Sequence, residues 1–88
     1  MTKKNELKNK LEELNKLEAI ADQAWEAYEA DPENEELGNA ADDAIDAQYN
    51  LFWEAVEMLQ ELAENKIDKI TAGRLIKHSR ERLMLILA

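Results

Sequence analysis

The apolar positions of this chain recur every three or four residues over three stretches, which is the spacing of one helical face. The stretches cover residues 5–30, 32–65 and 71–87. The first places Leu7, Leu11, Leu14, Leu17, Ile20, Ala21, Ala24, Trp25 and Tyr28 on its inner side. The second places Leu37, Ala41, Ile45, Gln48, Phe52, Ala55, Val56, Leu59, Leu62 and Ala63 there, and the third Leu75, Ile76, Ser79, Leu83, Ile86 and Leu87. No stretch alternates in the manner of a β-strand, so the pattern predicts an all-α fold.

Few residues interrupt these stretches, because the chain has two glycines and one proline. Asp31 suits the N-cap of the second helix and Pro32 its first helical position. Gly38 leaves open whether the helix begins at Pro32 or nearer residue 39. Thr71 is the expected N-cap of the third helix. Short connections make neighbouring helices antiparallel. We therefore expect residues 1–88 to form a single domain, a three-helix antiparallel bundle.

The three expected helices differ in length. At 1.5 Å per residue the second could reach about 50 Å and the third only about 25 Å. The hairpin of the first two helices should therefore protrude past the third, through an alanine-rich tip that buries little area. Trp25, Tyr28, Tyr49 and Phe52 are expected mainly in the core, whereas Trp53 should cover either the third helix or a partner.

Composition narrows the picture. The 88 residues, 45% of them hydrophobic, are enough for one small core, and the lack of cysteine removes disulfides, thiolate nucleophiles and cysteine zinc sites. A net charge of −9 argues against direct nucleic-acid binding, which needs a basic face. The opening residues lack the apolar run of a signal peptide, and the longest apolar run, residues 83–88, is too short to span a membrane. We expect a cytoplasmic protein of a bacterial host, without membrane contact.

The acidic residues are distributed unevenly. Residues 17–65 contain 15 acidic residues and no lysine or arginine. On the second helix they recur on the face opposite Phe52 as a line about 31 Å long. The candidate partner-binding residues are Glu18, Asp22, Glu26 and Glu29 on the first helix, and Asp43, Asp46, Glu54, Glu57, Glu61 and Glu64 on the second.

Two interpretations of this acidic surface stand open: a solvated outer face, or a binding face for a basic protein. Solvated faces usually interleave Glu with Lys, because such pairs stabilise a helix. Here five like-charge neighbour pairs forgo about 1–2.5 kcal/mol before salt screening. The basic residues of the third stretch, Arg74, Lys77, Arg80 and Arg82, are expected near the acidic face of the same chain.

Catalytic chemistry has weaker support. Glu54-x-x-Glu57 and Glu61-x-x-Glu64 match the pairs with which all-α nucleotide pyrophosphohydrolases of the MazG type hold Mg²⁺. These acids point outward on the helical wheel, and no basic residue near them could hold a phosphate. The single histidine, His78, lacks a second imidazole for zinc. We therefore expect no catalytic residue, no metal site and no cofactor.

The end of the chain is apolar on every face of its helix from Leu83 to Leu87. A helix at the edge of a bundle buries only one side. Met84, Leu85 and Leu87 are accordingly candidate contacts to a second copy, in a homodimer, or to another partner.

The segment from Ile67 to Ile76 with Arg80-Glu81-Arg82-Leu83 resembles the closing segment of small phage and prophage accessory proteins of low-GC Gram-positive bacteria. The resemblance covers about a quarter of the chain and implies a protein that binds and blocks a host protein. The leading hypothesis is a non-enzymatic phage-type inhibitor, of the anti-CRISPR or anti-restriction kind, that presents its acidic surface to a nucleic-acid-binding host protein. The alternatives are an oligomeric structural, adaptor or antitoxin-like module and, third, a Mg-dependent nucleotide pyrophosphohydrolase.

Overall fold

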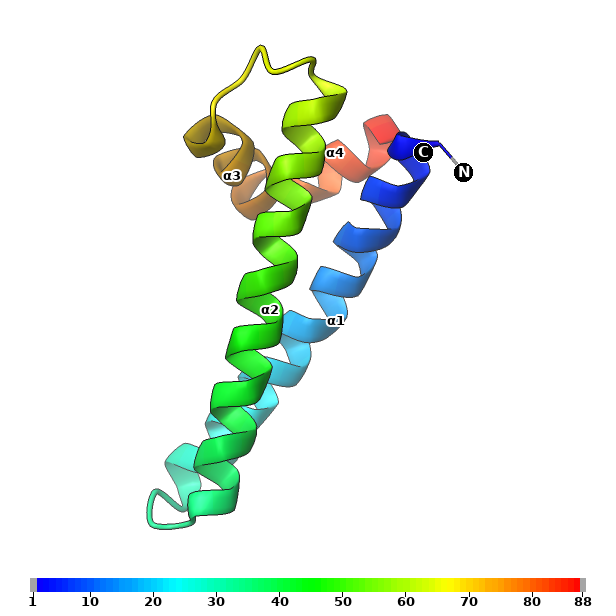
Figure 1. The fold of residues 1–88 in the computed structure, drawn as a ribbon. Coiled ribbons are helices and arrows are strands. Elements are labelled where there is room, and N and C mark those ends of the chain that lie inside the picture. Colours follow the sequence, from blue (N-terminus) through cyan, green and yellow to red (C-terminus); the bar gives the residue numbers. More distant parts are fainter. Residues whose placement is uncertain (1, 88) are drawn as a thin grey trace.

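The computed structural model describes residues 2–87 and confirms the all-α class (Figure 1). Its helices are α1 (Lys3–Ala30), α2 (Glu35–Leu62), α3 (Lys69–His78) and α4 (Arg80–Leu87). The expected third helix is thus two helices, and the three-helix count is wrong. Within residues 2–87 no segment forms a strand.

The α1–α2 hairpin determines the shape of the molecule. Each of its helices has 28 residues, about 42 Å of rise, and the longest dimension of the molecule is 47 Å. α3 and α4 have 10 and 8 residues and lie near the open end of the hairpin, where α1 begins and α2 ends. The other half of the hairpin, which we call the tip half, extends past them as a pair of helices (Figure 1).

The turn between α1 and α2 differs from the expected one. Asp31 ends α1 instead of starting α2, and its backbone N–H donates to the Tyr28 carbonyl at 3.1 Å. Asn34 is the N-cap of α2, because its Oδ1 accepts the N–H groups of Glu36 at 3.0 Å and Leu37 at 3.3 Å. An N-cap side-chain oxygen accepts N–H groups two or three residues ahead of it, and Asn34 has this position at the start of α2. Pro32 precedes Asn34, so it belongs to the turn and not to the helix.

Gly38 does not interrupt α2, since its N–H donates to the Asn34 carbonyl at 3.2 Å and the helix continues through it. Its lack of a side chain serves packing instead. A Cβ at this position would lie 3.3 Å from Cε1 of Tyr28 on α1. Glycine therefore lets the two helices approach closely at the tip.

The end of α2 lies three residues before the expected one, at Leu62. Glu64 and Asn65 have φ values of 56° and 61°, in the left-handed region. The Asn65 N–H donates to the Gln60 carbonyl at 2.8 Å, and the Glu64 N–H donates to the Glu61 carbonyl at 3.0 Å. This pair of bonds is a Schellman motif, which ends the helix by satisfying its last carbonyls.

Asp68, and not Thr71, caps α3. Its Oδ1 accepts the Thr71 N–H at 2.7 Å, and these hydrogen bonds from Thr71 lower the pKa of the Asp68 carboxyl. The helix then ends at Ser79, whose φ of −126° and ψ of 27° leave the helical region. Arg80 compensates for the break, because its side-chain Nε donates to the Ile76 carbonyl at 2.9 Å.

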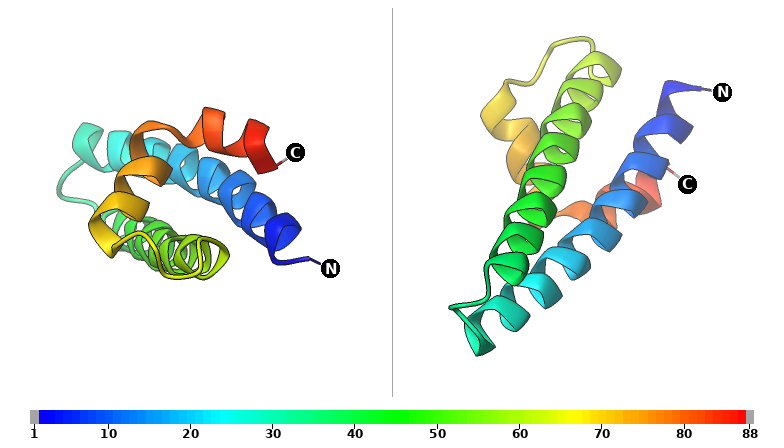
Figure 2. Two further views of the ribbon diagram at one scale, coloured as in Figure 1. Left: turned by 90° about the horizontal axis from the view of Figure 1, so that it is seen from above. Right: turned by 60° about the horizontal axis from the view of Figure 1, so that its bottom comes forward.

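The break at Ser79 allows two short helices to pack on different partners. α3 packs against α2, and α4 turns across to α1 (Figure 2). α4 joins α1 through its last residue, Leu87, and through Arg80 at its start. A continuous helix from residue 71 to 87 would follow only one of the two long helices.

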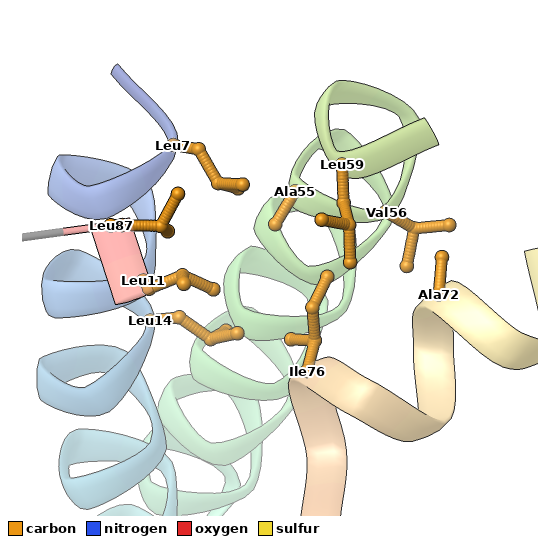
Figure 3. Close-up of a cluster of buried hydrophobic side chains, with 9 residues drawn as sticks. All are labelled: Leu7, Leu11, Leu14, Ala55, Val56, Leu59, Ala72, Ile76 and Leu87. Atoms are coloured by element: carbon orange, nitrogen blue, oxygen red, sulfur yellow. The ribbon is translucent and has the colours of Figure 1, made fainter. Parts of the chain in front are cut away.

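The core lies where all four helices meet (Figure 3). It consists of Leu7, Leu11, Leu14, Ala55, Val56, Leu59, Ala72, Ile76 and Leu87. Several residues expected to face inward are exposed, among them Ile20 by 52% and Ile86 by 67%. Ile86 is exposed although Leu83 and Leu87 of the same helix pack on the core, so the buried side of α4 is narrower than expected. Ile20 lies on α1 beyond the part that α3 and α4 cover.

Candidate protein-binding surfaces

The acidic row of α2, which we define as Asp43, Asp46, Glu54, Glu57 and Glu61, lies fully on the surface. Lysines of α1 reach two of its members: Lys10 Nζ lies 3.3 Å from Glu54 Oε2, and Lys3 Nζ lies 3.5 Å from Glu61 Oε2. Among residues 2–87 the structure contains no ion pair to the other three. The row is therefore partly neutralised toward the core end and fully charged toward the tip.

Glu64 does not continue this row, contrary to the helical-wheel prediction. It follows the end of α2 in a left-handed conformation, and its Oε2 lies 3.9 Å from Lys66 Nζ. The row of carboxylates on this helix face, which has one gap at Asn50, consequently stops at Glu61.

The acids of α1 form a second group. Glu18 is half-buried and binds the Arg80 guanidinium with both carboxylate oxygens, Oε2 at 3.2 Å from Nη2. Arg80 Nη1 also donates to Asn15 Oδ1 at 2.8 Å. As expected for this arginine, it lies against an acid of its own chain, and Glu18 thereby helps to hold α4 on α1.

Asp22, Glu26 and Glu29 line a hollow of the tip half together with Ala21 and residues of α2. An adjoining hollow begins at Glu18 and ends beneath Lys77 and Arg80, and the two hollows share Ile45 and Gln48. We call the two together the hairpin groove. Because Phe52 lines it and the acidic row lies opposite Phe52 on α2, nine of the ten predicted acids, all but Glu64, divide between two faces of the hairpin.

Large apolar side chains are exposed in this groove. Tyr49 is 60% exposed, Trp25 45%, Ile45 40% and Trp53 37%. The rings of Tyr49 and Trp53 meet edge to face with centroids 6.0 Å apart. The sequence pattern assigned Trp25, Ile45 and Tyr49 to the core and missed the groove. The signal that could have found it is the short third stretch, which cannot cover so long a hairpin.

The candidate oligomer contacts at the end of the chain behave differently from one another. Leu87 is 7% exposed and belongs to the core, so this prediction is wrong for Leu87. Met84 packs partly against the core, with its sulfur 3.9 Å from Asn15 Nδ2. Leu85 is 77% exposed and stays a candidate contact.

Glu54-x-x-Glu57 and Glu61-x-x-Glu64 all lie exposed, and two of the four are in ion pairs with lysines of α1. Across residues 2–87 no three His, Asp or Glu side chains gather as a metal site would require. His78 is exposed beside Lys77 and Arg82 at the α3–α4 junction.

Comparison of this chain with family models, with curated proteins and with solved structures finds no match. In the described part of the chain, none of the helices combines the length and the apolar character of a membrane span. Function is therefore inferred from the acidic row and the hairpin groove.

Proposed function

We propose that this chain is a non-enzymatic inhibitor that presents its acidic row to the basic surface of a nucleic-acid-binding host protein, as anti-CRISPR and anti-restriction proteins of phages do. One observation carries the proposal: residues 17–65 hold 15 acidic residues without a lysine or arginine, and they build most of the projecting hairpin. The resemblance of residues 67–76 and 80–83 to phage accessory proteins suggests the same setting.

Most neighbours in the row have a spacing that suits such a contact. Asp43 and Asp46, and Glu54, Glu57 and Glu61, lie three or four residues apart, which is about 4.5–6 Å along the helix axis and between one and two phosphate repeats of a nucleic-acid strand. Between Asp46 and Glu54 the row has one gap of about 12 Å. A helix held by a hairpin partner keeps these charges in fixed positions. It would compete for a phosphate-binding surface without offering bases to read, and its binding would weaken steeply as salt rises.

The test compares two variants that change the net charge equally. Asp46→Lys with Glu57→Lys reverses two members of the row that lack an ion pair among residues 2–87. Glu12→Lys with Glu13→Lys reverses two exposed acids of α1 outside both surfaces. Each protein is immobilised, exposed to a Gram-positive host lysate and eluted with salt, and the captured protein is then assayed for nucleic-acid binding with and without each variant.

The expected result is that the wild type and the Glu12/Glu13 variant capture the same protein and block its nucleic-acid binding, whereas the Asp46/Glu57 variant does neither. Helicity of the Asp46/Glu57 variant should stay unchanged, because each of its new lysines gains acidic neighbours one turn away. In the Glu12/Glu13 variant the new lysines lie one turn from Lys8, Lys10 and Lys16, so circular dichroism is used to verify its helix content before capture is compared. Capture that is equal for both variants, or a captured protein that still binds nucleic acid, would refute the proposal.

A second candidate is an oligomeric adaptor module. The exposure of Leu85 and Ile86 on α4 favours it, because adjacent exposed apolar side chains commonly mark a contact between copies. Light scattering of the wild type and of Leu85→Asp decides this candidate: only a dimer that Leu85→Asp dissociates would support it.

A further inference from the structure

Within residues 2–87, α3 and α4 cover one face of the hairpin near the core end, but the hairpin groove in the tip half has no such cover. Nearer the core end, α3 and α4 lie on this face of the hairpin and bury Ala72, Ile76 and Leu87 against α1 and α2. Beyond Lys77 and Arg80 this cover stops, and Trp25, Ile45 and Tyr49 are left exposed on both sides of the groove. The same apolar face thus runs from a covered half into an uncovered one.

The cover that the molecule provides for itself is basic and amphipathic. The segment that forms α3 and α4 carries the five basic residues Lys69, Arg74, Lys77, Arg80 and Arg82 and only one acidic residue, Glu81. Its apolar side faces the hairpin, and Arg80 is held by the Glu18 carboxylate of α1. An acidic residue of α1 at the groove edge therefore fixes a cation of a helix that covers the same face of the hairpin.

The uncovered half repeats this arrangement without the occupant. Asp22, Glu26 and Glu29 follow Glu18 along α1 at helical spacing and line the groove beside Trp25. Residues 17–65 supply no basic residue that could pair with them locally. From Glu18 to Glu29 α1 rises by about 16 Å, which matches a helix of about eleven residues, or three turns.

We propose that the tip half of the hairpin groove binds a basic amphipathic helix of the partner protein, which continues along the hairpin where α3 and α4 stop. Its apolar residues at i, i+3 or i+4 and i+7 would cover Trp25, Ile45 and Tyr49, and its Lys or Arg residues would meet Asp22, Glu26 and Glu29. A second copy of this chain fits less well, because its own groove has the same acidic edge and like charges would meet.

The proposal rests on the proposed function in expecting a basic protein partner, but it concerns the other face of the hairpin. The acidic row lies opposite Phe52, whereas Phe52 lines the groove. The two surfaces can therefore be disabled separately, and each serves as the control for the other.

The chain carries its own reporter for the test, since both of its tryptophans, Trp25 and Trp53, line the groove. The probe is a synthetic peptide of about 15 residues without tryptophan, with leucine at one helical face and lysine elsewhere. A scrambled peptide of the same composition controls for charge alone, and a peptide with glutamate in place of lysine controls for apolar contact alone. Titration is followed by the tryptophan emission of the full chain.

The amphipathic lysine peptide should shift the tryptophan emission to the blue and saturate, while both control peptides should bind at least about tenfold more weakly. Glu26→Lys with Glu29→Lys should raise the Kd about tenfold, and Asp46→Lys with Glu57→Lys, of identical net charge, should leave it unchanged. Ile45→Glu, at a partly exposed position where the fold should survive, should remove binding while circular dichroism keeps its helical signal.

Three results would overturn the proposal. One is equal binding of the amphipathic and scrambled peptides, and another is equal loss in the two double lysine variants, since either means that net charge alone attracts the peptide. The third is self-association of the wild type that Ile45→Glu abolishes, which would assign the groove to a second copy. Loss of host-protein capture by Asp46→Lys/Glu57→Lys with intact peptide binding would support the two surfaces as independent.

Discussion

The two halves of the hairpin use the same pair of helices and have opposite characters. At the core end Leu7, Leu11 and Leu14 of α1 are fully buried, because α2, α3 and α4 surround them. In the tip half the buried residues of α1 and α2 are Ala21 and Ala41, and the large side chains are exposed. Burial here is decided by which neighbours reach a position, since apolar residues occur at helical spacing in both halves. Stability should therefore concentrate at the core end and binding at the tip.

The strongest way to break this comparison is to truncate one large side chain in each half. Leu11→Ala removes a fully buried side chain and should lower the free energy of unfolding by about 3 kcal/mol. Ile45→Ala removes a side chain that is 40% exposed and should cost less than about 1 kcal/mol. Urea denaturation of both variants measures the difference, and similar losses would show that the tip half is packed as firmly as the core.

The next test concerns the ion pair and hydrogen bonds of Arg80, which hold α4 on α1. Arg80→Met removes the bonds to Glu18, Asn15 and the Ile76 carbonyl and should cost about 2 kcal/mol. Adding Glu18→Gln should recover part of the loss, because the partly buried carboxylate no longer lacks its partner. Thermal unfolding followed by circular dichroism measures both, and a double variant less stable than Arg80→Met alone would contradict this account.

Alanine substitutions at the two glycines test the packing of the two ends on a finer scale, because Gly73 of α3 faces Phe52 and Gly38 of α2 faces Tyr28 at the tip. Gly73→Ala places a Cβ 3.5 Å from Phe52 Cζ, an ordinary contact, and should stabilise the protein by about 0.5–1 kcal/mol through helix propensity. Gly38→Ala places it 3.3 Å from Tyr28 Cε1, so the ring has to shift and the gain should be smaller. Equal gains in urea denaturation would indicate that the tip half adjusts freely.

The smallest effect depends on pH and is confined to the start of α3. The pKa of Asp68 lies below its ordinary value of 3.8, because Thr71 donates to the carboxylate. The folded state therefore gains stability from this charge above pH 3.8, and loses it as the pH falls through the lower folded pKa. The difference in unfolding free energy between wild type and Asp68→Asn should shrink as acid is added. A difference constant from neutral pH to pH 2 would contradict the role of the charge.

Helical periodicity was sufficient to predict the helical class, the long hairpin and most of the core residues, because these follow from local spacing. It placed two N-caps wrongly, at Asp31 for α2 and at Thr71 for α3. In the case of α2, Asp31 and Asn34 are both good capping residues, and only the geometry of the turn chooses between them. It could not locate the break at Ser79, because neither glycine nor proline lies beside this residue. The break follows instead from the packing of α3 on α2 and of α4 on α1.

The same distinction, between what local spacing determines and what long-range packing determines, applies to the candidate site. Periodicity placed six carboxylates on one face of the second helix; five of them are exposed on α2, whereas Glu64 lies beyond the end of the helix. It placed Arg80 near the acidic face but could not single out Glu18 as its partner, nor foresee that Lys3 and Lys10 reach α2, because these pairs join residues far apart in the sequence. The groove was missed since an apolar stripe predicts burial, while burial also needs a neighbour long enough to cover it.

The break at Ser79 also bears on the order in which the chain assembles. Glu18 and Arg80 are 62 residues apart, and joining them in an otherwise unfolded chain would cost about 4 kcal/mol of closure entropy. Once the hairpin has formed and α3 lies on α2, the same contact needs only a short swing of α4 about Ser79. α4 has eight residues, too few for a helix stable by itself, so it gains its structure on docking. In that order of assembly, the break at Ser79 replaces a costly long-range closure with a local movement of one short helix.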